Sequence, residues 1–477
     1  MTRHTPDFEP EFSGAAGSAP HVIIIGGGAS GVLLAVQFLS RKDSNFFVSI
    51  IEARPRVGLG LAYSTEDDDH LLNTRAQHMS ALADQPGHFL AWLARNGLFA
   101  DPDAFVSRSI YGRYLAELLA PWQKGEDKRR LRLVQATFTS LREHMDGVIA
   151  HLDNGTVLIG ELAVLATGHS APAPAPGTAL TDPWAPAPAP APEDRVAILG
   201  TGLSKVDSVL TLLNAGHSGP IIALSRRGLL PRDHAHTNPL VIRLEDLPLG
   251  ATASATLHWM RGLARKAEAA GGTWRDAVDG IRPHVRRLWR ALPQAERARF
   301  LRHAAPWWDV HRHRIPPESR QRLDAALASG QLTLLRGAFV AARPTDGAID
   351  LYWRPHRQRA PQALRVARVT DCRGLRGDPA ATPSPVIRDL LDRGSARIDP
   401  LRLGLDTDTD GRLRREDASI SWRIRAIGPV TRAAFWEITA IPDIREQAAR
   451  MSADLSELAR RADAGHPVLH EFSGTPV

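Results

Sequence analysis

Two stretches of the chain have the form of a buried strand that runs into a glycine-rich turn and then a helix. In the first, residues 21–25 precede the turn Gly26-Gly27-Gly28-Ala29-Ser30-Gly31. In the second, residues 195–199 precede Gly200-Thr201-Gly202-Leu203-Ser204-Lys205. Such a turn lets a pyrophosphate approach the backbone at the N-terminus of the helix. Because one chain carries two such turns about 170 residues apart, it is predicted to bind a flavin and a nicotinamide together.

The strand after the first turn ends in a carboxylate. Residues 46–51 read as an apolar strand, and Glu52 follows 21 residues after Gly31. A carboxylate at this place accepts hydrogen bonds from an adenosine ribose and repels a 2′-phosphate, which favours FAD or NAD. We therefore assign the first site to FAD, with the binding residues Gly26, Gly28, Ser30, Gly31 and Glu52.

The strand after the second turn, residues 221–224, is followed by two arginines and no carboxylate. Guanidinium groups bind phosphate with two parallel hydrogen bonds, so this end suits the 2′-phosphate of NADPH. The predicted NADPH site consists of Gly200, Gly202, Ser204, Arg226 and Arg227. The alternative is that the arginines form a solvated strand end. Lys205 stands where a third glycine is expected, so either the helix stands farther off or the side chain extends towards the phosphates.

Length and composition exclude several classes of protein. A chain of 477 residues exceeds one compact core and indicates two or three domains. Although the net charge is +7, the cations are spread along the chain, which argues against a nucleic-acid partner. The single cysteine, Cys372, excludes an internal disulfide and a redox-active cysteine pair. No metal site is expected, since the acidic run at residues 66–70 reads as a solvated turn.

Residues 1–20 are polar and contain three acidic residues, so they are not expected to act as a secretory signal. No apolar run reaches the ~20 residues that a membrane span needs. These observations predict a cytoplasmic enzyme with no membrane partner.

The order of the motifs predicts an α/β fold with two Rossmann-like dinucleotide-binding domains and a helical insertion in the second. A strand that ends at Thr167 and Gly168 closes the first unit, and a later strand that ends at Gly428 completes the FAD site. The predicted division is a disordered lead-in at 1–20, an FAD-binding domain at 21–170 and 375–477, a Pro/Ala-rich linker at 171–192, and an NADP-binding domain at 193–374 with its insertion at about 240–330.

Several further motifs carry a family resemblance. They are the runs at residues 58–63, 70–73, 111–115, 225–231 and 307–314. With these, the chain resembles a bacterial family of FAD/NAD(P)-binding proteins that is related to the N-hydroxylating, class B-like flavin monooxygenases. The resemblance covers nearly the whole chain after residue 20, and the Baeyer–Villiger signature is not present.

The resemblance implies an NADPH-dependent flavoprotein that reacts with dioxygen. It would form a flavin C4a-hydroperoxide and oxygenate a small amine or amino acid. It places Asn73, Arg75 and His78 beside the isoalloxazine as catalytic candidates, although the same loop could be held by ordinary hydrogen bonds. His169 could cover the flavin or be an ordinary loop residue. The run at 307–314 suits a carboxylate-bearing substrate, but a helix end packed by two tryptophans is the preferred interpretation.

Three functions stay open at this point. The first is the monooxygenase. The second is an FAD/NADPH oxidoreductase that passes electrons to a quinone or protein acceptor without inserting oxygen. The third is a non-catalytic, cofactor-binding redox module. The motifs specify neither the substrate nor an oligomeric state.

Overall fold

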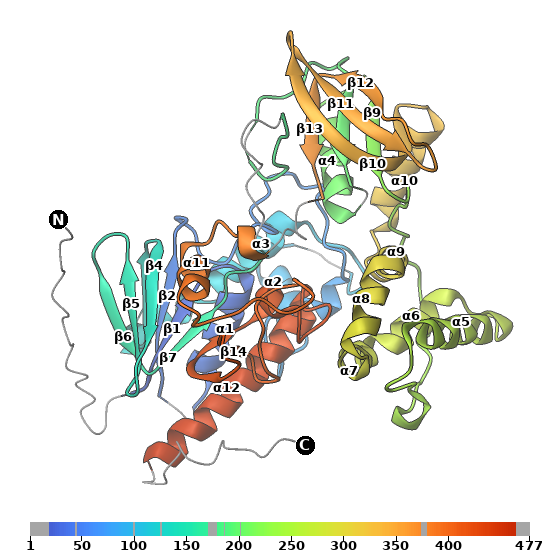
Figure 1. Ribbon diagram of the computed structural model, residues 1–477. Helices are drawn as coiled ribbons and strands as arrows, with labels where there is room; N and C mark the ends of the chain where they lie inside the picture. The colour runs from blue at the N-terminus through green and yellow to red at the C-terminus, as the bar shows by residue number, and fades with distance from the viewer. Residues whose placement is uncertain are drawn as a thin grey trace.

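The computed structural model describes residues 19–42, 45–98, 101–124, 126–169, 179–185, 187–200, 202–373 and 379–463. Two α/β units lie side by side, and a group of helices projects from the second (Figure 1). The α/β class that the motif order predicts is therefore confirmed. Of the predicted lead-in, residues 1–18 lie outside the described residues, as do 171–178 and 186 of the predicted linker. The described part of that linker contains no helix or strand, and its Thr181 pairs with Thr370.

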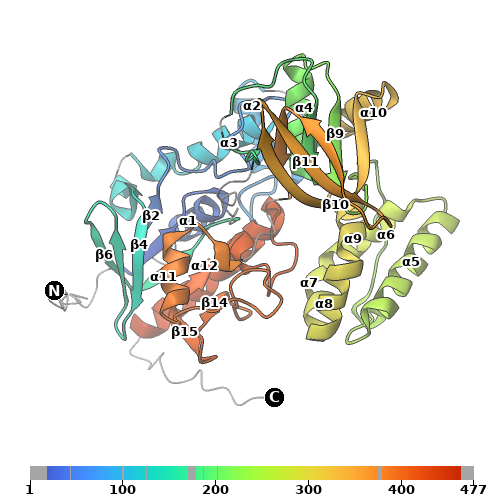
Figure 2. The same ribbon diagram turned by 45° about the horizontal axis from the view of Figure 1, so that its top comes forward.

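The first sheet has the strand order β14-β15-β7-β1-β2-β3, and only β14 runs antiparallel to its neighbour. Its central strands β7, β1 and β2 are buried because both faces are covered. The helices α1 and α12 pack together on one face, and the small sheet β4-β5-β6 with α11 covers the other (Figure 2). The strands are β1 (His21–Ile25), β2 (Phe47–Glu52), β3 (Leu131–Gln135), β4 (Phe138–Glu143), β5 (Val148–Leu152), β6 (Val157–Gly160), β7 (Leu162–Leu165), β14 (Arg412–Arg414) and β15 (Ile420–Ala426). The helices are α1 (Ala29–Ser40), α2 (His88–Arg95), α3 (Arg108–Glu117), α11 (Pro385–Asp392) and α12 (Ile441–Asp463).

The second sheet has the order β12-β11-β10-β9-β8-β13. Its β13, β8, β9 and the start of β10 are parallel, whereas β11 and β12 extend it as an antiparallel meander. Apolar residues of α4 and α10 form its core together with β8 and β9. The strands are β8 (Val196–Leu199), β9 (Ile221–Ser225), β10 (Leu332–Thr345), β11 (Ala348–Pro355), β12 (Gln362–Val366) and β13 (Arg368–Asp371). The helices are α4 (Leu203–Asn214) and α10 (Pro317–Ala328).

Between β9 and α10 the chain forms a helical arm. Its helices are α5 (Ala253–Ala269), α6 (Trp274–Ile281), α7 (Val285–Ala291), α8 (Gln294–His303) and α9 (Ala305–Arg312). The arm returns to the first unit, because Trp289 stacks on Trp436 with ring centroids 4.4 Å apart and donates its Nε1–H to the Ala433 carbonyl. Of the two adjacent tryptophans in α9, Trp308 is buried and Trp307 is exposed. The predicted helix end packed by both tryptophans therefore uses only one of them.

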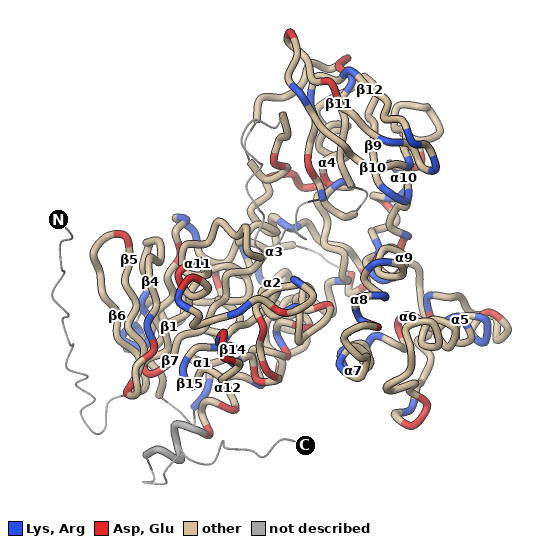
Figure 3. The backbone as a smooth tube through the Cα atoms, viewed as in Figure 1, with Lys and Arg blue, Asp and Glu red and all other residues tan. Residues whose placement is uncertain are grey.

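Short 3-10 turns occur at Ala76–His78, Ala120–Trp122, Glu126–Arg130, Leu244–Asp246, Arg282–His284, Pro379–Ala381 and Gly428–Thr431. Cationic and anionic residues alternate over both units rather than gathering on one face (Figure 3). Within the described ranges, no helix has the length and apolarity to cross a bilayer. The same part of the chain contains no cluster of three or more His, Cys, Asp or Glu side chains that could hold a metal ion.

Candidate functional site

A cavity of about 840 Å³ lies between the two units. Its wall includes Gly26 and Gly28 of the first glycine turn and Gly202 and Ser204 of the second. The carboxyl ends of β1 and β8 lead into these turns, so both parallel sheets present the same edge to the cavity. Ligands bind at this edge in open α/β sheets. The structure thus brings the two predicted dinucleotide sites to one space.

The glycines of the first turn have two different roles. Some are needed by the fold, and one leaves space for a ligand. A Cβ on Gly26, whose φ is +105°, would lie 2.5 Å from the Ala166 carbonyl oxygen, and a Cβ on Gly31 would lie 2.0 Å from the Gly26 oxygen. A Cβ on Gly28 would meet only Gly60, at 3.4 Å. The space in front of Gly28 therefore opens into the cavity. No side chain caps α1 at this end, so its first N–H groups can face a phosphate.

Glu52 is buried beside this turn, and its carboxylate is already partly engaged. Its Oε2 accepts a 2.9 Å hydrogen bond from the Gly27 N–H, and its Oε1 accepts 3.0 Å hydrogen bonds from the backbone N–H and the Nε of Arg54. The carboxylate still forms part of the cavity wall. Glu52 therefore supports the turn as well as facing the place where a ribose would lie.

The strand ends near the first turn contribute in different ways. Thr167 and Gly168 line the cavity, and the buried Thr167 Oγ1 has no hydrogen-bond partner among the described residues. A buried hydroxyl of this kind is normally satisfied by a water or a ligand. Gly428 does not line the cavity, although a Cβ there would lie 2.4 Å from the Ser30 Oγ. It lets the C-terminal segment approach the first turn.

The second turn repeats this arrangement. A Cβ on Gly200, whose φ is +99°, would lie 2.7 Å from the Cys372 carbonyl oxygen, whereas a Cβ on Gly202 would meet nothing within 4 Å. Lys205 is fully buried and is not part of the cavity wall, and burial lowers its pKa to about 7. Of the two alternatives for Lys205, extension towards the phosphates is therefore not what the structure shows.

The two arginines after β9 lie in different surroundings, and neither lines the cavity. Arg227 Nη2 donates to the carbonyl oxygens of Arg302 and His303 at 3.1 and 3.2 Å, which ties β9 to the arm. Arg226 is exposed and makes no hydrogen bond or ion pair with any described residue. Arg226 is thus the arginine that remains available for a 2′-phosphate.

We expect the substitution Arg226→Ala to raise KM for NADPH by about tenfold or more, because a charge-assisted hydrogen bond contributes about 1.5–3 kcal/mol. KM for NADH should change little, since NADH has no 2′-phosphate. Arg227→Ala is the matched control and should lower thermal stability with similar effects on both nucleotides. Steady-state kinetics with each nucleotide measure this, and equal losses for NADPH and NADH in Arg226→Ala would contradict the assignment.

The three catalytic candidates differ in whether they line the cavity. Asn73 lines the cavity, and its carbonyl accepts a 3.0 Å hydrogen bond from His234 Nε2. Arg75 and His78 are not part of the cavity wall. Arg75 Nη1 donates to the Asp103 carbonyl at 2.7 Å, and its guanidinium lies over the Phe105 ring. Only Asn73 therefore reaches the cavity directly.

One part of the cavity wall is formed by charged residues that the sequence motifs did not reveal in full. This part, the charged wall, consists of Asp309, Arg312, His313 and Glu437. Asp309, Arg312 and His313 of α9 and its C-terminal end face Glu437 of the C-terminal segment there. Buried Glu437 accepts hydrogen bonds from Trp308 Nε1 and from Arg312 Nε, the latter at 3.0 Å. Its φ of +69° is unusual for a residue other than glycine and is typical of functional sites. The run at 307–314 pointed to α9, but no sequence signal pointed to Glu437.

Two histidines near the cavity are held neutral. Burial, and after it the Arg432 charge, lowers the pKa of His169 to about 4. Burial, and after it the Arg314 charge, lowers the pKa of His234 to about 4. His169 lines the cavity, so an uncharged imidazole faces the space between the two turns.

These pKa values predict a loss of stability in acid. Below about pH 6.5 the unfolded chain binds protons at these histidines that the folded protein binds only near pH 4, so the free energy of unfolding falls as the pH drops through this window. His234→Gln keeps a hydrogen-bond donor for Asn73 and removes the titration. We expect it to lose less stability between pH 7 and pH 4.5 than the unsubstituted protein, by on the order of 1–3 kcal/mol. Thermal or urea unfolding at stepped pH measures this, and parallel pH profiles would contradict it.

Comparison with known proteins agrees with this geometry. A family model described as FAD-NAD(P)-binding matches residues 23–170, which contain the first turn, Glu52 and the Thr167-Gly168 strand end. Residues 23–170 are an FAD/NAD(P)-binding domain. No curated protein sequence matches this chain.

Solved structures share its fold at low sequence identity. An ornithine N-hydroxylase from Kutzneria sp. 744 in complex with reduced FAD, NADP⁺ and L-ornithine is 13% identical, with a TM-score of 0.61 over 93% of this chain and 100% of that chain. L-lysine 6-monooxygenase from Pseudomonas syringae is 17% identical, with a TM-score of 0.62 over 92% and 99%. The bacillithiol disulfide reductase of Staphylococcus aureus is 13% identical, with a TM-score of 0.52 over 93% and 99%. The prediction of a flavoprotein fold with two dinucleotide-binding units, similar to the N-hydroxylating monooxygenases, is confirmed.

Proposed function

We propose that this FAD/NAD(P)-binding protein is an NADPH-dependent flavin oxidoreductase that oxygenates a small amine or amino acid with dioxygen. The observation that supports this most is that both glycine turns open into one cavity. Hydride transfer needs the nicotinamide and the flavin to meet with their reacting atoms in contact. Two nucleotide sites that faced separate surfaces could not provide this.

The residues of the site fit the two cofactors. The open space at Gly28, the uncapped N-terminus of α1 and the carboxylate of Glu52 would hold FAD, and Gly202 with the N-terminus of α4 would hold NADPH. FAD supplies hydride acceptance and oxygen activation when it is bound. The chain itself contributes orientation of the two nucleotides and exclusion of water, and a neutral His169 keeps a proton-bearing ring nitrogen in the cavity wall without adding charge.

The charged wall supports an amino acid as substrate. Arg312 supplies a cation whose Nε is fixed by Glu437, and its two Nη groups make no hydrogen bond with a described side chain. Asp309 supplies an anion four residues before His313, with which it pairs at 4.0 Å. A carboxylate and an ammonium group on one small molecule would find opposite charges on this wall.

The related reductase fold offers a competing function, which the cysteine content disfavours. Disulfide reduction through a redox-active thiol pair needs two cysteines, and this chain has a single cysteine. Burial raises the pKa of Cys372 to about 12, and its Sγ lies 3.3 Å from the Ser208 Oγ. A thiol with this pKa stays protonated and is a poor nucleophile.

The test follows flavin reduction and oxygen consumption separately. Under anaerobic conditions we expect NADPH to bleach the flavin absorbance. In air, a panel of amino acids and diamines should contain a compound that accelerates NADPH oxidation and suppresses hydrogen peroxide release, with a hydroxylated product detected by mass spectrometry. Reduction by NADPH with reoxidation that responds to a quinone but to no amine would instead support electron transfer. A flavin that neither NADPH nor NADH reduces would support the non-catalytic module.

A further inference from the structure

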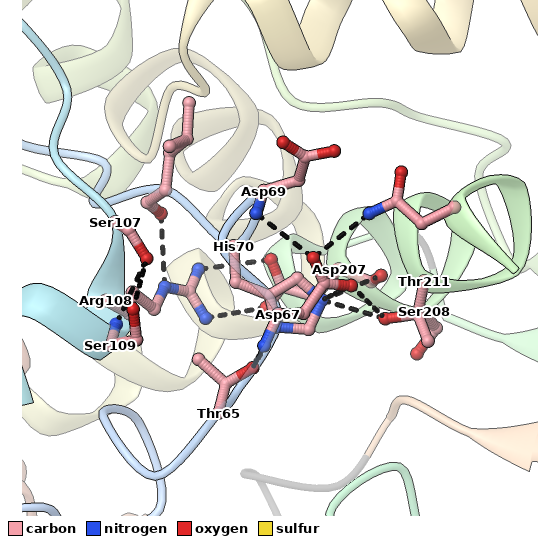
Figure 4. A network of polar contacts seen from close by, with 12 residues as sticks. Thr65, Asp67, Asp69, His70, Ser107, Arg108, Ser109, Asp207, Ser208 and Thr211 are labelled. Carbon is pink, nitrogen blue, oxygen red and sulfur yellow. Dashed lines mark hydrogen bonds and ion pairs between the residues drawn. The ribbon is translucent and has the colours of Figure 1, made fainter.

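A polar network joins the two units beside the cavity (Figure 4). From the first unit it contains the loop at 65–70 and the start of α3, and from the second it contains the inner face of α4. α4 is the helix that follows the second glycine turn. Any contact that fixes α4 therefore also fixes the place of that turn.

Arg108 and Asp207 form the centre of the network. Arg108 Nη1 donates to Asp207 Oδ2 at 2.7 Å and Nη2 donates to Oδ1 at 3.2 Å, so the pair is held by two hydrogen bonds at once. The two side chains are only 13% and 12% exposed. A two-bond, partly buried pair of this kind sets the relative orientation of its partners more strictly than a single contact does.

Arg108 is itself fixed by its own unit. Its Nε donates to the Leu71 carbonyl at 3.1 Å, and its backbone N–H donates to the His70 carbonyl at 2.9 Å. Its remaining nitrogens are directed at Asp207 on the opposite unit. Arg108 and Asp207 both belong to the cavity wall, as do Gly202 and Ser204 one turn earlier in the chain.

Further contacts hold the same face of α4. His70 Nε2 lies 3.2 Å from the Asp207 carbonyl oxygen and 2.9 Å from Thr211 Oγ1. Asp67 accepts hydrogen bonds from Thr211 Oγ1 at 3.1 Å and from Asn214 Nδ2 at 3.0 Å. The loop at 65–70 thus follows α4 along its length.

One contact of this interface is peripheral and offers a matched comparison. Asp69 pairs with Arg322 of α10, with the two side chains 52% and 35% exposed, and neither residue lines the cavity. Exposed pairs of this kind contribute little. Loss of this exposed pair should therefore change the join between the units much less than loss of the Arg108–Asp207 pair.

We propose that Arg108 and Asp207 are a positioning pair that holds the second glycine turn in the orientation at which its nicotinamide reaches the flavin of the first unit. The inference rests on the proposed function, since it concerns hydride transfer between the two nucleotides. In this role the pair acts through α4, on which Asp207 lies. Its loss slows flavin reduction without removing either nucleotide from its site.

The experiment compares Asp207→Asn, Arg108→Lys and the charge exchange Arg108→Asp/Asp207→Arg with the control Arg322→Gln. Anaerobic stopped-flow reduction over a series of NADPH concentrations gives a limiting rate and a Kd. A displacement of about 1 Å can cost on the order of a hundredfold in rate, so we expect the limiting rate of Asp207→Asn to fall by about 10- to 100-fold. The Kd of this variant for NADPH should stay within about threefold of that of the unsubstituted protein, because the substitution affects the hydride-transfer step and not binding.

Arg108→Lys keeps the charge but loses the two-bond geometry. Its limiting rate of flavin reduction should therefore lie between that of Asp207→Asn and that of the unsubstituted protein. Arg108→Lys also provides the test of the pair if Asp207→Asn does not fold. The charge exchange should recover part of the lost rate. The limiting rate of Arg322→Gln should stay within about twofold of that of the unsubstituted protein, because an exposed ion pair contributes little. Reduction by dithionite should be the same in all variants.

Hydrogen–deuterium exchange of the full chain gives a readout that does not depend on turnover. We expect faster exchange in the first half of α4, residues 203–210, for Asp207→Asn. Arg322 also donates to Asn214 at the C-terminal end of α4 and pairs with Asp69. Any faster exchange in Arg322→Gln should therefore be confined to that end of the helix and to the loop at 65–70. A wild-type limiting rate and wild-type exchange in Asp207→Asn would overturn the proposal, as would equal slowing in Arg322→Gln. If NADPH and NADH both fail to reduce the unsubstituted protein, the proposed function fails instead. The exchange data then still decide whether the pair fixes α4.

Discussion

Gly28→Val is expected to produce a folded protein that does not retain FAD. A Cβ at this position meets only Gly60, at 3.4 Å, so the backbone tolerates the side chain. The two further methyl groups of valine would then occupy the space into which the pyrophosphate fits. We expect the Kd for FAD to rise by at least about a hundredfold, equivalent to about 2.8 kcal/mol. Visible absorbance of the purified protein and titration with FAD measure this.

A second substitution separates loss of the ligand from loss of the fold. Gly31→Ala would place its Cβ 2.0 Å from the Gly26 oxygen and should lower the thermal unfolding temperature whether or not FAD is present. Gly28→Val should unfold close to the temperature of the unsubstituted protein prepared without FAD. A yellow Gly28→Val protein with a full complement of FAD would remove the first turn from the site.

Gly202→Val is expected to have the complementary effect. A Cβ at Gly202 meets nothing within 4 Å, so the fold should again tolerate the change. The protein should retain FAD and be reduced by dithionite, but its reduction at NADPH concentrations that saturate the unsubstituted protein should slow by at least about a hundredfold, because the side chain fills the pyrophosphate site of the second turn. Anaerobic stopped-flow absorbance measures this.

The control for this variant is Gly262→Ala, in α5, where a Cβ also meets nothing within 4 Å. It should change neither the FAD content nor the rate of reduction. If Gly202→Val lost FAD together with its response to NADPH, the two turns would not be separate sites, and the assignment of one nucleotide to each would be wrong.

The parts of the fold that could be predicted from the sequence are those encoded over short distances. A strand, a glycine turn and a helix occupy about 20 consecutive residues, and their apolar pattern and glycine spacing are visible in one window. The antiparallel pairing of β10, β11 and β12 is not visible in one window, because it depends on a long β10 that pairs with β9 at its start and with β11 along the rest.

The candidate site was harder to predict because it is assembled from distant segments. Arg312 and Glu437 are 125 residues apart in the chain. The positive φ of Glu437 could not be predicted either, because the residue is not a glycine. Arg227 looked equivalent to Arg226 in sequence, and only the approach of α8 to its Nη2 distinguishes the two. The position of His78 away from the cavity likewise depends on how the loop at 73–78 packs on the second unit.

The path of the chain through the first sheet also bears on how the protein is made. The second sheet is built entirely from residues 196–371. In the first sheet, by contrast, β14 and β15, which extend it beyond β7, come from residues 412–426. During synthesis the second unit therefore emerges whole while the first still lacks β14, β15, α11 and α12. The unit that begins first in the chain is therefore the one that is completed last.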